Sequence, residues 1–474
     1  MKKLSFLLLF LGMQWCALAK PELIISLNMN ECANCYNALS NLKDLDSSFS
    51  LKYILPEEYE VDSIELKEYL SLPNQGEYLW SNALNNKYLI NNVFSSITLV
   101  TENENMSFLV KEELDKDLVK YFNSLLEEEY IYDFKDNIFK VSNKYMKYYK
   151  NWVFISNNLT KNITKANFIT GESKSIIKYT DKVINEAYQL ANKDKDLIFG
   201  IGEKYGVKNQ YTPESFDVYK DKVYLMTSYL DYHFENNFKD TLQLKFLSLQ
   251  VFDLHGQLLN TYVVDYVLND IINGGMDYYT EVNSFKVESD SVFYFGLASG
   301  NDTINVEKEG YFIGTYHLNK RKNKIAFAQP WPFLLGEQYK YIGYNYANVN
   351  FSYDGRAVVN LLNDSIYVNS GGFKSYSMKV FEGNEPMKEL RFYLNKKNRE
   401  AAITDKYIYL SYVIDGYLKY AKKEFNSEQV IIEDVFHFDE VSKMEYAIQI
   451  DYLNSDYLIT PINHNQIKRY KTFK

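Results

Sequence analysis

The chain has 474 residues, of which 46% are hydrophobic and 24% are charged, and its formal net charge at pH 7 is −10. This length exceeds one ordinary folded core, because domains contain about 100 to 200 residues. Nucleic acids and anionic lipids bind to basic protein surfaces, so the acidic balance argues against both as partners. We therefore expect two folded domains and no nucleic-acid partner.

The amino terminus has the organisation of a signal peptide. Met1-Lys2-Lys3 gives a basic start, residues 4–11 are apolar, and Ala17-Leu18-Ala19 is a small-x-small sequence. The apolar segment is far shorter than the roughly 20 residues that span a bilayer, and no other segment approaches that length. We expect residues 1–19 to be removed on export and no membrane span to remain.

The mature chain would keep two cysteines, Cys32 and Cys35. They follow an apolar run at residues 23–27, which has the length of a strand. Apolar residues then recur at helical spacing, at Tyr36, Leu39, Leu42 and Leu45. The pattern therefore places the Cys-x-x-Cys pair at a junction between a strand and a helix.

Further elements follow in the same region. Residues 50–55 predict a second strand, and residues 62–65 have the form of a capping box before a helical segment. Residues 97–100 and 106–110 predict a hairpin. A last helix is predicted from its apolar positions Leu114, Leu118, Phe122 and Leu125. The expected order is strand, cysteine helix, strand, helical region, strand, strand and helix.

This order resembles the thioredoxin fold along the whole of residues 20–128. A Cys-x-x-Cys pair at such a junction is the redox motif of that family. Backbone N–H groups at a helix start lower a thiol pKa and so create a nucleophile. The resemblance implies that Cys32 attacks a disulfide and that Cys35 resolves the mixed disulfide.

Two features of the sequence depart from the family, and they leave alternatives open. The stretch at residues 93–98 lacks the cis-proline that faces the cysteines in thioredoxin-like enzymes, and Glu31 precedes the pair where a tryptophan is usual. A carboxylate beside a thiol disfavours the thiolate. Cys32 and Cys35 could instead form a passive disulfide or remain free thiols. Metal binding is disfavoured because the histidines all lie in the other domain, at His233, His255, His317, His437 and His464.

Residues 129–474 change to a succession of short β-rich runs. A unit of strand, polar turn and strand, clearest at residues 215–225, returns five times, at 139–156, 284–296, 350–368, 400–411 and 444–460. A second hairpin follows several units, clearest at residues 249–259. Two hairpins per repeat make a four-stranded propeller blade. Second strands at Val153, Val223, Val292, Ile366, Ile408 and Tyr457 predict six blades, with a seven-bladed count or an irregular blade as the alternative.

The Val251-to-Leu259 hairpin and the glycine loop at residues 200–206 are similar to the six-bladed propellers of bacterial envelope proteins, the TolB-like and NHL-like group. Closure of the ring is expected to pair residues 131–141 with residues 467–473, because a propeller must satisfy its terminal edges. The glycine loop is not a dinucleotide fingerprint, since its third glycine is misplaced. His255 and Asp354-Gly355 are interpreted as turn residues, and His437 as a packed strand residue.

The fold class expected is therefore an N-terminal α/β thioredoxin-like domain followed by an all-β propeller. The leading hypothesis is an exported thiol-disulfide protein, periplasmic, in the cell envelope or secreted, with catalytic Cys32 and Cys35 and a propeller that recognises a protein, peptide or glycan. No cofactor and no metal are expected. The alternative is a non-catalytic binding or scaffold protein. A propeller hydrolase or lyase is a third possibility, which would need acids and histidines converging at the channel mouth.

Overall fold

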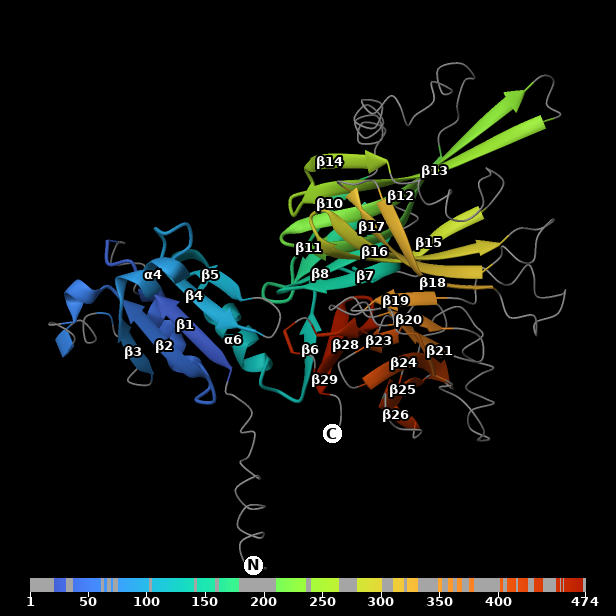
Figure 1. Ribbon diagram of the computed structural model, residues 1–474. Coiled ribbons are helices and arrows are strands. Elements are labelled where there is room, and N and C mark those ends of the chain that lie inside the picture. Colours follow the sequence, from blue (N-terminus) through green and yellow to red (C-terminus); the bar gives the residue numbers. More distant parts are fainter. Residues whose placement is uncertain are drawn as a thin grey trace, which may run out of the picture. The chain divides into compact units, whose positions relative to one another are not determined.

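The structure, a computed structural model, divides the chain into two compact units, Met1–Tyr130 and Ile131–Lys474. Figure 1 shows a mixed α/β unit and a β-rich unit, and each is described here by itself. The sequence-based division lies between residues 128 and 129. The residues that the structure describes are 21–30, 37–60, 64–65, 70, 76–101, 105–139, 143–157, 162–178, 210–235, 240–263, 279–300, 310–318, 322–330, 348–351, 357–360, 365–368, 375–378, 401–403, 407–414, 417–424, 430–437, 449–451, 453–454 and 456–471.

The first unit is built on a five-stranded mixed sheet with the order β3-β2-β1-β4-β5. Strand β1 (Glu22–Ser26) lies at its centre, parallel to β2 (Ser50–Leu55) and antiparallel to β4 (Ser96–Val100). Strand β3 (Glu77–Trp80) extends the parallel half, and β5 (Met106–Leu109) pairs with β4 as the predicted hairpin. The predicted strand at residues 50–55 is thus confirmed.

Short helices accompany this sheet. The 3₁₀ helix η1 (Ala38–Asp44) buries Leu39 and Leu42, so the predicted apolar stripe is present on a tighter helix than expected. A 3₁₀ turn, η2 (Glu57–Tyr59), follows β2, and α4 (Asn82–Tyr88) follows β3. A helical turn, α5 (Val110–Glu113), precedes α6 (Lys116–Ser124), the last helix expected from the sequence. Of the predicted helical region at 62–70, only residues 64, 65 and 70 are described.

The last helix supplies the centre of an aromatic core. Phe122 of α6 is fully buried, and its ring centroid lies 6.3 Å from that of Phe49 and 5.8 Å from that of Phe108. Asp115 caps the helix by accepting a hydrogen bond from the Leu118 amide at 2.9 Å. Aromatic burial of this kind dominates the energetics of small cores, so α6 anchors to the sheet through Phe122.

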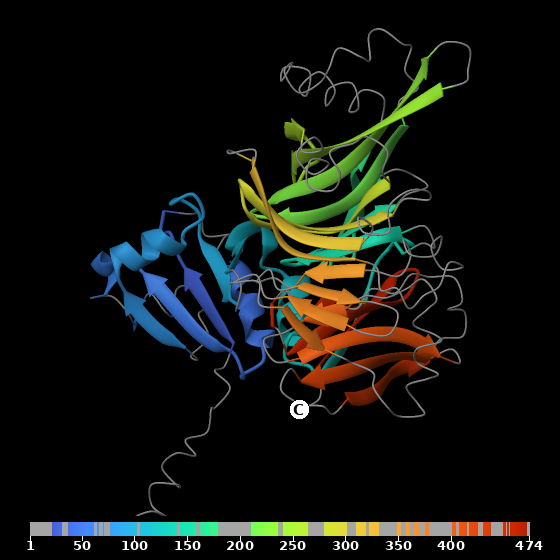
Figure 2. The same cartoon turned by 45° about the vertical axis from the view of Figure 1, so that its right-hand side comes forward.

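The described residues of the second unit form six four-stranded sheets, a propeller-like arrangement. Five of them use consecutive strands in chain order. Figure 2 shows three such sheets, in yellow to orange-red, following one another around this unit. Their strands are β7 (Asn143–Tyr149), β8 (Trp152–Asn157), β9 (Asn162–Asn167), β10 (Ser173–Lys178); β11 (Gln210–Tyr219), β12 (Lys222–Glu235), β13 (Asp240–Asp253), β14 (Leu258–Val263); β15 (Tyr279–Ser289), β16 (Val292–Gly300), β17 (Gly310–His317), β18 (Lys322–Pro330); β19 (Asn348–Phe351), β20 (Ala357–Asn360), β21 (Ser365–Val368), β22 (Ser375–Met378); β23 (Ala401–Ile403), β24 (Tyr407–Ile414), β25 (Tyr417–Glu424) and β26 (Val430–His437).

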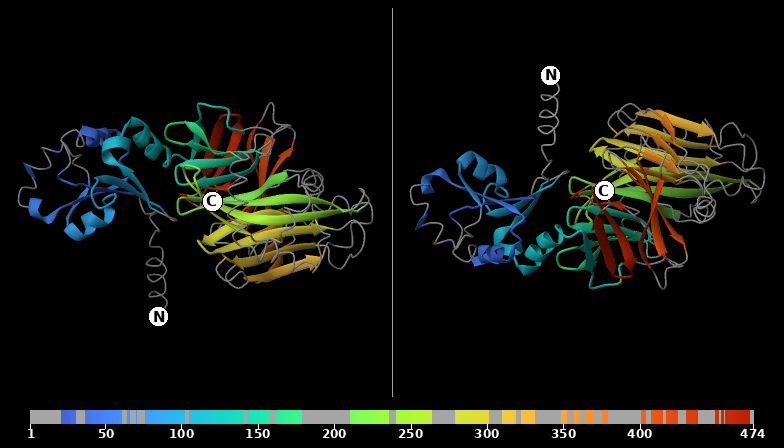
Figure 3. Two further views of the ribbon diagram at one scale, coloured as in Figure 1. Left: turned by 90° about the horizontal axis from the view of Figure 1, so that it is seen from above. Right: turned by 90° about the horizontal axis from the view of Figure 1, so that it is seen from below.

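The first strands of successive sheets are neighbours. Strand β11 contacts β7 and β15, β15 contacts β19, and β23 contacts β19 and β27. In both views of Figure 3, the teal, green, yellow and orange sheets of this unit follow one another in chain order. A first strand that touches the first strands on both sides lies at the inner edge of its blade. The expected six units therefore correspond to six sheets.

The sixth sheet closes the ring with strands from both ends of the unit. Its order is β27 (Gln449–Ile450), β28 (Tyr457–Asn463), β29 (Gln466–Lys471) and β6 (Glu129–Asp133). The segment that follows β6 is also tied to the β28–β29 turn, because the Phe134 amide donates to the Asn465 carbonyl at 2.8 Å. The pairing of the first and last β segments was predicted, since it removes an open strand edge.

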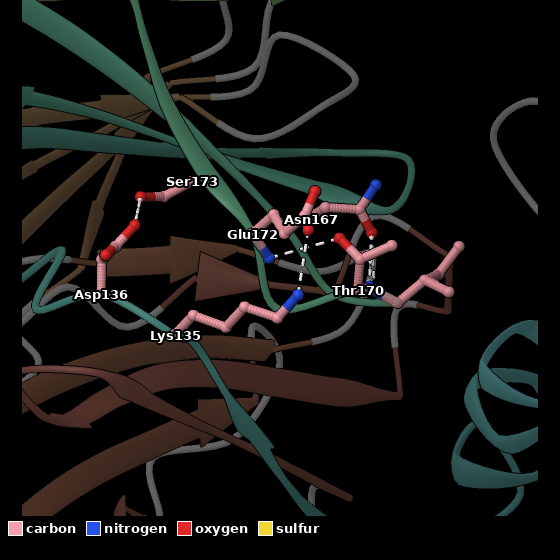
Figure 4. Close-up of polar contacts among 7 residues, drawn as sticks. Lys135, Asp136, Asn167, Thr170, Glu172 and Ser173 are labelled. Atoms are coloured by element: carbon pink, nitrogen blue, oxygen red, sulfur yellow. Dashed lines mark hydrogen bonds and ion pairs between the residues drawn. The ribbon is translucent and has the colours of Figure 1, made fainter.

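The same segment is joined to the first sheet by the polar contacts in Figure 4. Lys135 Nζ lies 2.9 Å from Glu172 Oε1 (Figure 4). The Lys135 amide also donates to the Gly171 carbonyl at 2.8 Å. Ser173 Oγ donates to Asp136 Oδ2 at 2.6 Å. The chain between β6 and β7 therefore bridges the sixth and first sheets through the β9–β10 turn.

Three expectations are corrected or left untested by this fold. Ile366, counted as a second strand, lies in β21, the third strand of its sheet. Strand β3 and helix α4 were not expected. The structure shows a mixed sheet with this strand order in the first unit. Its thioredoxin-like identity stays a prediction. Within the described ranges, no helix combines the length and apolar character needed to cross a membrane.

Candidate functional site

The predicted site residues Cys32 and Cys35 lie outside the described residues, as does Glu31. The structure does describe the chain on both sides of them. Residues 21–30 include the central strand β1 and its carboxyl end, and residue 37 leads directly into η1. The groups that hold these two flanks form the described part of the candidate site.

The end of β1 is tied to α4 by a buried polar contact. The Asn85 side chain is 4% exposed, and its Nδ2 donates to the Leu27 carbonyl at 3.1 Å. Ser26, which is fully buried, donates from Oγ to the Asn85 carbonyl at 3.0 Å and also to Asn85 Oδ1. Buried polar atoms are costly unless they are paired, so this contact fixes α4 against the last residues of β1.

The next residue, Asn28, is tied to the segment that enters β4. Its backbone amide donates to Ser95 Oγ at 2.9 Å, and its Nδ2 donates to the Val93 carbonyl. Its Oδ1 accepts a hydrogen bond from the Asn30 amide at 3.0 Å, which shapes the turn after β1. We call Asn28, Val93 and Ser95 the Asn28 clamp. It fixes the chain four residues before Cys32.

Ser95 and Ser96 lie at the start of β4 and make different contacts. Ser95 is 1% exposed, and Ser96 Oγ donates to the Tyr88 carbonyl at 2.5 Å. Among the residues that the structure describes, every peptide bond is trans. Ser95 therefore faces the chain that leads to the cysteine pair, whereas Ser96 faces α4.

The loop before Ser95 is a tight turn with two apolar side chains at its tip. Asn91 and Asn92 have φ of 56° and 58°, a left-handed conformation that asparagine tolerates. Ile90 and Phe94 close the turn through two backbone hydrogen bonds of 3.0 Å. Val93 is 50% exposed and Phe94 is 45% exposed. Rigid backbone thus presents exposed apolar side chains beside the clamp.

In the second unit, the two-residue turns between first and second strands carry ion pairs between neighbouring sheets. Lys150 Nζ lies 3.0 Å from Asp221 Oδ1, and Lys222 Nζ lies 2.9 Å from Asp290 Oδ1. Tyr224 Oη donates to the same Asp290 oxygen at 2.6 Å. The hydrogen bond from Tyr224 is the largest effect that lowers the pKa of Asp290. Each turn is therefore fastened to the next sheet along the chain.

A buried ion pair joins the inner strands of the second and third sheets. Asp217 of β11 is 3% exposed and Lys286 of β15 is 8% exposed, and Lys286 Nζ lies 3.3 Å from Asp217 Oδ2. The same oxygen accepts a hydrogen bond from the Val287 amide at 2.8 Å. Because both charges are compensated within the contact, this pair reads as a joint between blades rather than as a reactive site.

Two histidines of the second unit, His255 and His464, lie in described turns. His255 lies in the β13–β14 turn, where its amide donates to Asp253 Oδ1 at 2.9 Å, so its interpretation as a turn residue is confirmed. His464 Nδ1 lies 3.0 Å from the Phe139 carbonyl oxygen. Residues 200–206 and Asp354-Gly355 fall outside the described residues. No metal-binding group of three histidine, cysteine or acidic residues occurs in the part of the chain that the structure describes.

The two ends of the second unit differ in the length of their connections. In an antiparallel sheet in chain order, the turns from first to second strand emerge at one end, and the connections to the next sheet emerge at the other. The first kind spans only residues 150–151, 220–221 and 290–291 in the first three sheets. The second kind spans residues 179–209, 264–278 and 331–347.

Comparison with known proteins gives structural matches only. No family model and no curated protein matches the chain. Among solved structures, the Malassezia sympodialis allergen Mala s 1 is 11% identical, with 73% of this chain and 96% of that chain covered and a TM-score of 0.41. A Bacteroides fragilis protein described as exported is 9% identical, with 73% and 95% covered and a TM-score of 0.40.

A third match is TolB from Acinetobacter baumannii, which is 9% identical, with 80% of this chain and 76% of that chain covered and a TM-score of 0.33. These similarities are too low for functional conclusions. The propeller-like description of the second unit rests on its own strand order.

Proposed function

We propose that the chain is an exported thiol-disulfide protein in which the first unit is a thioredoxin-like domain and the second recognises the partner. The observation that carries the proposal is the strand order of the first sheet. Cys32 and Cys35 follow β1, the central strand, which has a parallel neighbour on one side and an antiparallel neighbour on the other. The carboxyl end of a central strand is where such sheets hold their reactive groups.

The proposed reaction is an exchange between two dithiol-disulfide couples. The thiolate of Cys32 attacks one sulfur of a partner disulfide, and the other partner sulfur leaves as a thiolate. Cys35 then attacks the mixed disulfide, which releases the second partner sulfur and forms the Cys32–Cys35 disulfide. The partner disulfide is reduced by two electrons and the cysteine pair is oxidised by two electrons, so no cofactor is required.

The proposal places the protein outside the cytoplasm, in the periplasm, in the cell envelope or in the secreted fraction. The basic and apolar leader at residues 1–19 supports this placement. The partner would be a protein or peptide that carries a thiol or disulfide, or a glycan, bound at the end of the second unit where the long connections gather. Long connections carry binding functions more often than short turns do.

Turnover of the purified protein tests the proposal. We expect reduction of insulin and exchange with glutathione, abolished by Cys32→Ala. Cys35→Ala should trap a mixed disulfide that a thiol reagent releases. Ser40→Ala, an exposed position on η1, is the matched control and should leave both reactions unchanged. A wild-type protein that neither reduces insulin nor exchanges with glutathione would refute the catalytic proposal.

A second candidate is a non-catalytic binding or scaffold protein, favoured by Ser95 in a trans peptide where enzymes of the thioredoxin family have a cis-proline. In that case the first unit is an adaptor, and the second unit docks a protein, peptide or glycan. Titration of Cys32 separates the two candidates. A pKa well below about 8.5 supports thiol chemistry, and an ordinary value supports the adaptor.

A further inference from the structure

The segment that leads to Cys32 is held by one residue with three hydrogen bonds. Asn28 donates from its backbone amide to Ser95 Oγ at 2.9 Å and from Nδ2 to the Val93 carbonyl, and its Oδ1 accepts from the Asn30 amide at 3.0 Å. Asparagine is suited to this because its side chain carries both a donor and an acceptor. A single residue, through its backbone amide and its side chain, thereby connects the end of β1, the turn after it and the approach to β4.

The anchor on the other side of the clamp is itself immobilised. Ser95 is 1% exposed, and its carbonyl accepts a hydrogen bond from the Val110 amide at 3.0 Å. Val110, at the start of α5, is fully buried. The hydroxyl that receives the Asn28 amide is therefore part of the core and not of a surface loop.

The backbone that carries Val93 is equally constrained. The turn is defined by the Ile90–Phe94 bridge and by the left-handed conformation of Asn91 and Asn92. Asn28 lies outside this turn, and its Nδ2 donates a hydrogen bond to the Val93 carbonyl. The partners of Asn28 are thus held in place by contacts that do not involve Asn28. The clamp transfers this rigidity to the chain that enters the cysteine pair.

We infer that Asn28, with Ser95 as its anchor, is a positioning residue for the thiol chemistry of Cys32. The inference rests on the proposed thiol-disulfide function. In this chain the buried Ser95 hydroxyl and the Asn28 carboxamide fix the approach to the cysteines, at the place where the proline is missing. Exchange requires the attacking sulfur in line with the disulfide that it cleaves, and loss of orientation slows such reactions by one to two orders of magnitude.

The experiment measures the rate of disulfide exchange of the full chain as a function of pH, together with the reduction potential of the cysteine pair. The variants are Asn28→Ala and Ser95→Ala, each of which removes part of the clamp without adding atoms to the core. The matched control is Asn123→Ala. Asn123 also ties a loop with its side chain, donating to the Asp44 carbonyl at 3.0 Å and accepting from the Asp46 amide at 2.9 Å.

We expect Asn28→Ala and Ser95→Ala to slow exchange about tenfold and to shift its pH profile, whereas Asn123→Ala keeps the wild-type rate and profile. A wild-type protein that exchanges, with Asn28→Ala within twofold of it, overturns the inference and leaves the proposed function standing. Equal slowing in all three variants, with lowered unfolding temperatures, also overturns it, because general loosening would then explain the effect. A wild-type protein without exchange refutes the proposed function itself.

Discussion

The buried ion pair of the sixth sheet gives a sharp prediction about stability. Arg469 of β29 is 2% exposed and Asp451 is 3% exposed, and Arg469 Nε donates to Asp451 Oδ2 at 2.6 Å. The guanidinium also lies 3.5 Å from the centroid of the Tyr457 ring. We consider Asp451→Asn, which keeps the shape of the side chain and removes its charge.

The expected loss of unfolding free energy depends on the buried Arg469 charge that the variant leaves without its partner. Breaking a buried ion pair from one side costs about 3 to 5 kcal/mol, because the remaining charge is buried without compensation. The ring of Tyr457 still faces the cation, and such a contact stabilises a buried cation by up to about 2 kcal/mol. We therefore expect a loss of unfolding free energy at the lower end of this range, about 3 kcal/mol. With a denaturant slope of about 3 kcal/mol per molar urea, the midpoint falls by about 1 M.

Urea unfolding of the full chain measures this loss, with the transition of the second unit followed separately from that of the first. The control is Glu172→Gln, which breaks the Lys135–Glu172 pair, whose side chains are 62% and 69% exposed. An exposed pair contributes about 0 to 1 kcal/mol. Combining Asp451→Asn with Arg469→Met should recover part of the loss, since the buried charge is then gone. Equal shifts for Asp451→Asn and Glu172→Gln would refute the reasoning.

Three other substitutions test the fold. Gly256→Ala should destabilise the second unit by at least about 1 kcal/mol, because Gly256 has a φ of +89° and an added Cβ would lie 1.6 Å from the Ile176 carbonyl oxygen; an unchanged urea midpoint would contradict the turn geometry. Asp290 has a pKa held below 3.8, mainly by the Tyr224 hydroxyl, so its contribution is complete above that value and lost as the pH falls. Asp290→Asn should therefore lower stability at pH 6 by up to about 1 kcal/mol and have a smaller effect as the pH falls below the ordinary Asp pKa; a pH-independent difference would argue against the contact. Asn85→Ala should cost about 1 to 3 kcal/mol in the first unit by leaving buried groups unpaired, measured by thermal unfolding; a negligible change would mean that water replaces the amide.

The sequence predicted those elements of the first unit whose apolar positions are periodic. Residues 50–55 became β2, and the stripe through Leu118 and Phe122 became the buried face of α6. Helix α4 was missed because Asn82–Tyr88 is rich in asparagine, a weak helix former. One signal was present: Ser81 caps α4 by accepting from the Leu84 amide at 3.3 Å. A capping residue followed by no apolar stripe is easily passed over.

In the second unit, turn chemistry made the hairpins readable. Lys220 and Asp221 adopt φ of 46° and 57°, the left-handed pair that a two-residue hairpin turn requires. The same reasoning gave a wrong strand assignment in the fourth sheet. Ile366 was predicted to lie in a second strand, yet it lies in β21, the third strand of its sheet. Local alternation identifies a hairpin but does not say which of the blade's hairpins it is.

The Asn28 clamp could not be predicted from sequence, since its two halves are separated by 67 residues. Asn28 and Ser95 are polar residues in loops, a class that carries no periodic signal. Their pairing follows from the register of the antiparallel β1–β4 pair, in which Ser26 lies opposite Ser96. Each residue extends its strand beyond that last register pair, so the contact depends on a sheet that the sequence only outlines.

The two-residue turns at one end of the second unit have a structural role. The two-residue turns carry the contacts that fasten one sheet to the next, through Lys150, Asp221 and Asp290. A residue committed to such a contact cannot change without loosening the ring. The long connections at the opposite end, such as residues 179–209, follow strands that are already paired on the sheet. Because ring closure is achieved by β6 and the short turns, sequence at that opposite end is free to specify a ligand, which is why we expect the partner to bind there.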